Sequence, residues 1–144
     1  MAEIVETVAR KLGGQAVLGS EVRSQADLAR AVHKRLPLAA LVGMSLAGLT
    51  NREIDQMVIP DRTRRHRATR DEPLTVEESD RAVRLLRIQS LAEETFANRD
   101  NANRWLRLGL AELSGETPLS VAQTEAGARL IETVLAKIAW GAAA

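Results

Sequence analysis

The chain has 144 residues, of which 45% are apolar and 27% are charged, and it contains no cysteine. This length suits one domain or two small modules, and the composition is that of a globular protein rather than a disordered chain. The lack of cysteine excludes disulfides, thiolate metal sites and cysteine nucleophiles. The only two histidines, His33 and His66, are far apart in the sequence, which argues against a histidine zinc site or a catalytic triad. We therefore expect a protein that is not an enzyme and that binds no cofactor or metal.

The formal net charge is only +1, but the charges are unevenly distributed. Residues 61–70 contain five arginines and one aspartate, a local charge of +4, whereas residues 71–80 contain five acidic residues and no basic ones. Such a change of sign between neighbouring stretches indicates two surfaces with different tasks.

Nothing in the sequence predicts a membrane segment. Glu3 and Glu6 stand where a signal peptide would be apolar, and the apolar run 36–49 is interrupted by a proline and two glycines and is too short to span a bilayer. We expect a cytoplasmic protein.

Apolar residues recur at three- and four-residue spacings, with almost no alternation of the kind that marks strands. The expected helices begin, in chain order, near Ile4, Ser24, Pro37, Thr50, Asp61, Val76, Asp100, Thr117 and Thr124, and the first ends at Gly13-Gly14. The longest covers about 76–97. The sequence thus predicts an all-α fold, with an N-terminal module over 1–73 and a linking helix and C-terminal domain over 74–144.

Residues 50–70 have the layout of a helix-turn-helix motif. A capped short helix is followed by a tight turn at Ile59-Pro60 and then by an arginine-rich helix. In this motif the second helix enters the major groove of DNA, where arginine contacts phosphates and guanine edges. The candidate DNA-binding residues are Arg62, Thr63, Arg64, Arg65, His66 and Arg67. The alternative is a basic helix that binds nothing or pairs with the acidic residues at 71–80.

The apolar run 36–49 contains more large apolar side chains than one face of a helix can bury. Its large side chains cannot all face one side of a helix: Leu38, Leu41, Val42, Met44, Leu46 and Leu49. We expect part of the run to lie in a symmetric self-interface, and hence a homodimer, because such dimers are the commonest soluble oligomers. A wholly internal helix is the alternative.

The last third of the chain carries the more specific pattern. Trp105-Leu106 supplies a large apolar anchor, Gly115 permits a turn, and Thr117-Pro118-Leu119 can cap and open a helical turn. Gly127, in the helix start Thr124-Glu125-Ala126-Gly127, indicates close packing against a neighbour, since glycine inside a helix costs about 1 kcal/mol relative to alanine.

These residues resemble the C-terminal toxin-binding domain of the Xre/MbcA/ParS antitoxins over the run from Arg104 to Gly141. The similarity extends back to about Thr50 and includes the linking helix around Ser79-Asp80-Arg81. The usual Pro-Asn of one family loop is replaced here by Gly109-Leu110. The resemblance implies an Xre-like helix-turn-helix module joined by a long helix to a small helical toxin-binding domain.

The resemblance also implies an antitoxin of a type II toxin–antitoxin system. Its partner would be a cognate RES-domain toxin that consumes NAD, and the C-terminal helix and tail would occupy the toxin's NAD cleft. The N-terminal module would dimerise and bind operator DNA of its own operon, as a transcription repressor. The expected toxin-binding residues are Leu130, Val134, Lys137, Ile138, Trp140, Gly141 and Ala144.

A second interpretation stays open. The chain could be a stand-alone helix-turn-helix transcriptional regulator whose C-terminal module only dimerises. Toxicity of a neighbouring gene product that disappears on co-expression would distinguish the antitoxin from this regulator.

Overall fold

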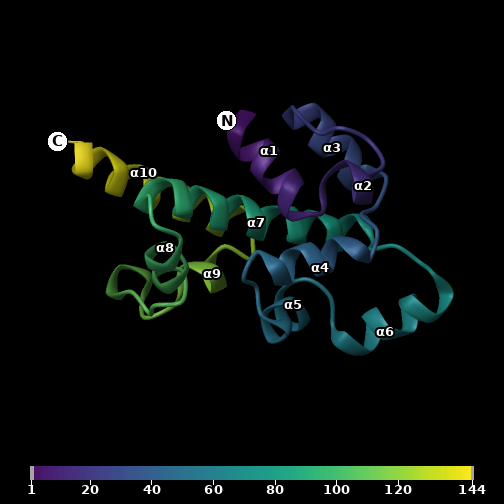
Figure 1. Ribbon diagram of the computed structural model, residues 1–144. Coiled ribbons are helices and arrows are strands. Elements are labelled where there is room, and N and C mark those ends of the chain that lie inside the picture. The colour runs from purple at the N-terminus through teal and green to yellow at the C-terminus, as the bar shows by residue number, and fades with distance from the viewer. Residues whose placement is uncertain (1, 144) are drawn as a thin grey trace. The chain divides into compact units, whose positions relative to one another are not determined.

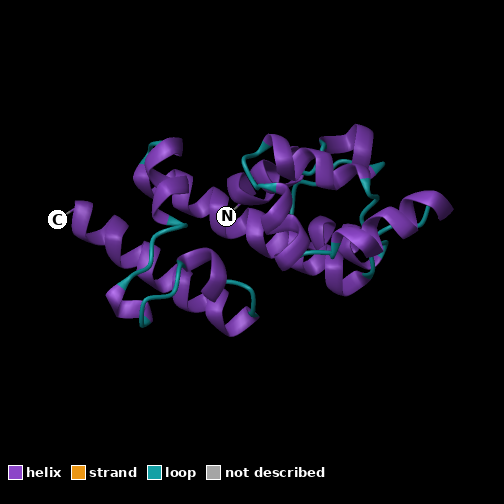
Figure 2. Cartoon of the chain, turned by 90° about the horizontal axis from the view of Figure 1, so that it is seen from below, coloured by secondary structure: helices purple, strands orange, loops and turns teal. Residues whose placement is uncertain are grey.

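The computed structural model describes residues 2–143, and in this range the chain consists of helices and loops without a strand (Figure 2). The all-α fold predicted from the sequence is thus confirmed for the described residues. The chain divides into two compact units, residues 1–83 and 84–144. Helix α7 (Val76–Phe96) contributes its first turns to one unit and its remaining turns to the other.

The N-terminal unit is built from short helices, which run from purple to teal in Figure 1. In this unit α4 packs against α1 and α2, while α6 lies at the outer edge (Figure 1). The helices that precede α7 are α1 (Ala2–Lys11), α2 (Gly14–Leu18), α3 (Gln25–His33), α4 (Ala39–Leu46), α5 (Asn51–Met57) and α6 (Asp61–Arg70).

Capping boxes open α3 and α5, at the starts near Ser24 and Thr50 that the sequence predicts. The Thr50 side chain accepts the backbone N–H of Glu53 at 3.1 Å, and the Glu53 side chain accepts the N–H of Thr50 at 2.9 Å. Ser24 and Asp27 form the same reciprocal pair at the start of α3. Each cap satisfies backbone donors that a helix start leaves unpaired, which is worth about 1 kcal/mol.

Helix α2 is an element that the sequence does not predict. Gly13 and Gly14 do end α1, with φ values of 110° and 68°, but the chain turns there and forms a further helical turn. The reason lies in tertiary packing. Leu18 at the end of α2 packs against a cluster formed by Val5 and Ala9 of α1 together with Val22.

The contact between α1 and α4 depends on a glycine. A Cβ at Gly43 would stand 2.0 Å from the carbonyl oxygen of Lys11, so the two backbones meet where a side chain would otherwise separate them. Leu12, Leu41 and Met44 are completely buried at this junction of the core.

The C-terminal unit contains the rest of α7, a set of short helices and one long final helix. The set consists of α8 (Arg99–Trp105), the short 3-10 helix η1 (Ala111–Leu113), α9 (Pro118–Val121) and α10 (Glu125–Ala143). As expected, Thr117 caps α9 and Pro118 occupies its first turn. The expectation that Asp100 caps α8 is wrong, because the Asn98 side chain accepts the backbone N–H of Asn101 and α8 begins at Arg99.

The core of this unit is apolar, with polar contacts tying α7 to its neighbours. Phe96 and Trp105 pack with their rings 5.5 Å apart, which holds α8 against the end of α7. On the other side, Arg84 donates to the carbonyl oxygen of Gln123 at 2.7 Å, and Arg87 pairs with Glu132 of α10 at 2.9 Å. Helix α10 is therefore fixed along α7 before its last turns.

Candidate functional sites

The turn between α5 and α6 is held by backbone and side-chain hydrogen bonds. Ile59 is completely buried, and its N–H donates to the carbonyl oxygen of Ile54 at 3.0 Å. The carboxylate of Asp55 accepts the backbone N–H of Asp61, the first residue of α6. Asp55 therefore caps the second helix of the motif from the preceding helix, a role that the local sequence does not reveal.

Helix α6 has no buried residue and projects at the edge of the N-terminal unit (Figure 1). Arg62, Arg65 and His66 are exposed, whereas Thr63 and Arg64 are half-buried. The exposed three lie within one turn of one another, so they share the outer face of the helix. This outer face is the basic surface that the sequence predicts.

Arg67 occupies the opposite side of α6 from this outer face. Its guanidinium forms an ion pair with the carboxylate of Glu78 on α7, and the two side chains are 15% and 8% exposed. Burial of the Glu78 carboxyl group opposes ionisation, but the hydrogen bonds from Arg67 and the Thr75 backbone prevail and lower the pKa of Glu78. The hydrogen bond to Glu78 raises the pKa of Arg67.

The other ion pairs of α6 are exposed. Arg65 pairs with Asp61 at 3.1 Å and Arg70 with Glu72 at 3.9 Å, and all four side chains are about half exposed or more. Such pairs contribute little to stability and separate readily when a stronger anion arrives. The basic surface of α6 thus stays available to phosphate, while Arg67 is engaged inside the unit.

A second exposed surface lies on α4. Val42 is 57% exposed and Leu46 is 79% exposed, and they stand one turn apart on the same face. Leu41 and Met44, on the other face, are completely buried. The apolar run of the sequence is therefore divided between the core and the surface.

A third surface follows α10 to its end. Trp140 is 80% exposed and Leu130 is 48% exposed, whereas Ile131 and Leu135 are completely buried. Among the other expected toxin-binding residues, Val134 and Ile138 are half-buried, and Lys137 and Gly141 are exposed.

Leu130, Val134, Lys137 and Gly141 recur at three- and four-residue spacings, which places them on one face of α10. Trp140 lies at the edge of this face. Helix α10 continues through Trp140 to Ala143, so the segment after Ile138 is helical rather than an irregular tail as far as it is described. Ala144 lies outside the described residues.

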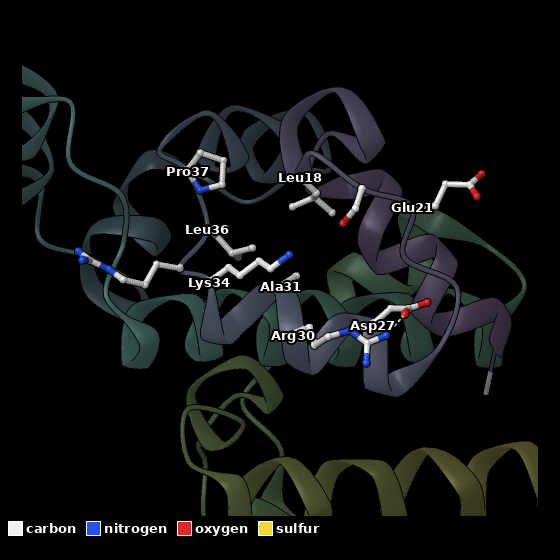
Figure 3. A pocket seen from close by; sticks show the side chains of 10 residues that line it. Leu18, Glu21, Asp27, Arg30, Ala31, Lys34, Leu36 and Pro37 are labelled. Carbon is white, nitrogen blue, oxygen red and sulfur yellow. Dashed lines mark hydrogen bonds and ion pairs between the residues drawn. The ribbon is translucent and has the colours of Figure 1, made fainter.

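The cavity of the N-terminal unit that is drawn in Figure 3 is small, with a volume of about 60 Å³. Leu18 and Lys34 line it, and so do Asp27 and Arg30, which form an ion pair. Pockets for small-molecule ligands usually measure about 300–1,000 Å³. This cavity is thus too small for a nucleotide.

Within residues 2–143 no helix is long and apolar enough to cross a membrane, and no cluster of three or more histidine, aspartate or glutamate side chains could hold a metal ion.

Comparison with known proteins supplies the family. Residues 27–87 match the family model of the antitoxin Xre-like helix-turn-helix domain, which includes α4, α5 and α6. Residues 91–141 match the model of the antitoxin Xre/MbcA/ParS C-terminal toxin-binding domain, which includes α8, α9 and most of α10.

One curated relative is similar in sequence over a large part of the chain. The "Antitoxin Xre" of Pseudomonas putida is 43% identical over 93 residues, which make up 65% of this chain and 58% of the relative's own length. The chain thus matches somewhat more than half of that protein. With both domain matches and this relative in agreement, the chain carries the helix-turn-helix domain and the C-terminal toxin-binding domain of the Xre/MbcA/ParS family of antitoxins.

Proposed function

We propose that this protein neutralises a cognate RES-domain toxin by placing the exposed face of α10 in the toxin's NAD-binding cleft. It acts in the cytoplasm by binding alone and catalyses no reaction. The observation that carries this proposal is the exposure of Trp140, which is 80% accessible at the end of a helix whose opposite face is buried. The C-terminal family match, to a toxin-binding domain, supports the same conclusion.

Trp140 has the properties of an interface anchor. A tryptophan buries about 150–250 Å² when it enters a pocket, and tryptophans are over-represented among the residues that dominate binding energy. Ala139 and Gly141, on either side of Trp140 in the sequence, are small and exposed, so little side-chain bulk stands next to the indole along the chain. Helical backbone also loses little conformational freedom on binding, which reduces the entropic cost of docking.

Titration of the toxin with variants of α10 tests this proposal. Trp140→Ala should weaken the complex by at least about thirtyfold, the size expected for an interface residue worth 2 kcal/mol or more. Ala139→Ser is the matched control, because Ala139 is an exposed neighbour on the same helical turn. Equal affinity of the two variants would contradict the proposal.

We propose in addition that α6 binds operator DNA of the toxin–antitoxin operon and so represses transcription. The match to an antitoxin helix-turn-helix domain over 27–87 supports this role. The exposed residues Arg62, Arg65 and His66 would contact phosphates and base edges, with Thr63 and Arg64 at the margin. Each substitution that removes a phosphate contact should reduce the slope of log affinity against log salt by about 0.9.

Homodimerisation through α4 completes the proposal. Val42 and Leu46 form an apolar pair on the surface of a unit whose core is otherwise closed. A self-complementary contact would cover both copies of this pair at once. A homodimer would also present two copies of α6 to a two-fold operator, as helix-turn-helix dimers do.

A stand-alone regulator remains the second candidate function, favoured by the helix-turn-helix match alone. Its C-terminal unit would serve only for dimerisation. This function would be favoured over the first if Trp140→Ala abolished the dimer and if the unaltered protein bound no product of a neighbouring gene in its operon.

A further inference from the structure

Helix α6 is attached to its unit by polar contacts rather than by apolar burial. It has no buried residue, while the two preceding helices, α4 and α5, each bury aliphatic side chains. A helix without apolar anchors depends on specific side-chain contacts for its position. The contacts that α6 makes with the rest of the unit therefore decide how its basic face is presented.

Glu78 makes the most buried of these contacts. Its oxygen Oε1 accepts the backbone N–H of Thr75 at 2.8 Å, which caps α7, and the same oxygen accepts Arg67 of α6. Glu78 is only 6% exposed as a residue. One carboxylate thus joins α6 to the first turn of α7.

The adjacent residues of α7 hold the rest of the motif in place. Arg81 donates from Nε and from one terminal nitrogen to the carbonyl oxygen of Val58, at 3.2 and 2.9 Å, just before the turn into α6. Ser79 is completely buried, and its hydroxyl oxygen accepts the backbone N–H of Leu36 at 2.9 Å. The first turns of α7 are therefore a fixed frame, and the Arg67–Glu78 pair connects α6 to that frame.

From this geometry we infer that Arg67 and Glu78 are positioning residues, which fix the orientation of α6 so that Arg62 and Arg65 reach DNA. Arg67 itself makes no DNA contact. This inference rests on the proposed DNA-binding function of α6. It separates Arg62 and Arg65 of the outer face, which bind DNA, from Arg67, which holds the helix.

The substitution Glu78→Gln gives opposite results under the two possible roles of Arg67. The glutamine can still accept the Thr75 N–H, because glutamine serves in capping boxes as glutamate does. If Glu78 positions α6, the loss of its charge loosens the helix, and affinity for a duplex of the protein's own promoter falls about tenfold or more. If Arg67 were instead a DNA contact restrained by Glu78, the same change would release it and strengthen binding.

Glu72→Gln is the matched control. It removes an equal charge beside α6, but from the exposed pair with Arg70, in which the two side chains are 48% and 63% exposed. Both substitutions reduce repulsion of DNA to a similar extent. Only Glu78→Gln should weaken binding, while Glu72→Gln should leave it unchanged or slightly stronger.

Amide hydrogen exchange of residues 61–70 tests the positioning role without DNA. Glu78→Gln should increase exchange in α6, and Glu72→Gln should not, because only the first loosens the helix. If Glu78→Gln does not fold, Glu78→Asp replaces it. Aspartate already serves at the same capping position in α3, as Asp27, but it is one methylene too short to keep the contact with Arg67.

The variant Arg62→Ala/Arg65→Ala separates failure of the inference from failure of the proposed function. If this variant binds the duplex like the unaltered protein, DNA binding by α6 is disproved and the inference falls with it. If it loses the duplex while Glu78→Gln retains full affinity and unchanged exchange, the inference alone is disproved. The expected result is loss of affinity in both, with faster exchange of α6 only in Glu78→Gln.

Discussion

A Cβ at Gly127 would stand 1.7 Å from the carbonyl oxygen of Val121, so the start of α10 packs directly on the end of α9. No side chain other than the hydrogen of glycine fits at this distance. The hydroxyl of Thr124 secures the same turn by accepting the Gly127 N–H at 3.0 Å. The direction in which α10 leaves the core, and thus where its exposed face points within the C-terminal unit, depends on this contact.

We predict that Gly127→Ala destabilises the C-terminal unit by about 1–3 kcal/mol, the cost of overpacking a tight contact. Gly141→Ala is the control on the same helix, because a Cβ there meets nothing within 4 Å. It should be neutral or stabilising by up to about 1 kcal/mol, since alanine favours helix more than glycine does. Thermal unfolding followed by circular dichroism measures both, and equal melting temperatures would refute the packing argument.

A second prediction concerns the start of α8. Asn98→Ala should cost about 1 kcal/mol of stability, because it removes the side chain that accepts the Asn101 N–H at 2.9 Å. Asp100→Ala should cost less, since Asp100 lies inside the first turn and contributes only through the helix dipole. Urea unfolding of the two variants gives the comparison. A greater loss in Asp100→Ala would show that the cap is assigned to the wrong residue.

The Arg67–Glu78 pair makes stability depend on pH. Because the pKa of Glu78 in the folded protein lies below its ordinary value of 4.5, the ionised carboxylate stabilises the fold above that pH. This contribution is lost as the pH falls below 4.5 through the lowered pKa. Arg67 remains charged throughout, and Glu72, which acts on Arg67 through its charge, is the other acidic group beside the pair.

The measurement is the urea midpoint of the unaltered protein and of Glu78→Gln between pH 7 and about pH 3. The difference between the two proteins should be constant above pH 4.5 and should shrink toward zero in acid. Asp27 contributes to the pH dependence of both proteins, because its pKa is also lowered, chiefly by the hydrogen bond from the Arg23 backbone. Subtracting the urea midpoint of the variant from that of the unaltered protein removes this shared contribution. A difference that grows in acid would contradict the sign of the Glu78 effect.

The exposed apolar pair on α4 predicts the oligomeric state. Leu46→Glu should convert the dimer into a monomer in sedimentation experiments at micromolar concentration, because it places a charge in the proposed interface. Gln56→Glu is the control, since it adds the same charge at another exposed position of the N-terminal unit. If the unaltered protein is already monomeric, α4 does not form a self-interface.

The parts of this fold that could be predicted from the sequence are those with local causes. The capping residues Thr50 and Thr75 fix the starts of α5 and α7 through hydrogen bonds three residues away, so their sequence signals suffice. Helix α2 could not be predicted, because it is held by the packing of Leu18 on Val5, Ala9 and Val22, which belong to other elements of the unit. Asn98 and Asp100 both suit a cap, and only the extended backbone of Asn98 identifies it.

The candidate sites also combine features with local causes, which the sequence predicts, and features that depend on tertiary packing, which it does not. The arginine content of 61–70 predicts a basic helix, but which arginine turns inward depends on where α7 lies, and the sequence does not contain that information in any local form. Likewise, the apolar residues of 125–138 predict an amphipathic helix, yet Leu130 is 48% exposed while its neighbour Ile131 is fully buried. The continuation of the helix through Trp140 to Ala143 agrees with the high helix propensity of alanine, which here outweighs the glycine at 141.

The rate of NAD consumption by the RES-domain toxin that we propose as the partner tests the central claim most directly. It is measured with the full chain, with Trp140→Ala, with Ala139→Ser and with a chain ended after Ile138, which removes the exposed residues Ala139, Trp140 and Gly141 together with the three alanines that follow. Our account predicts that the full chain and Ala139→Ser stop NAD consumption at equal concentrations. Trp140→Ala and the shortened chain should require at least about thirtyfold more protein. Inhibition by the shortened chain at the same concentration as the full chain would contradict the account.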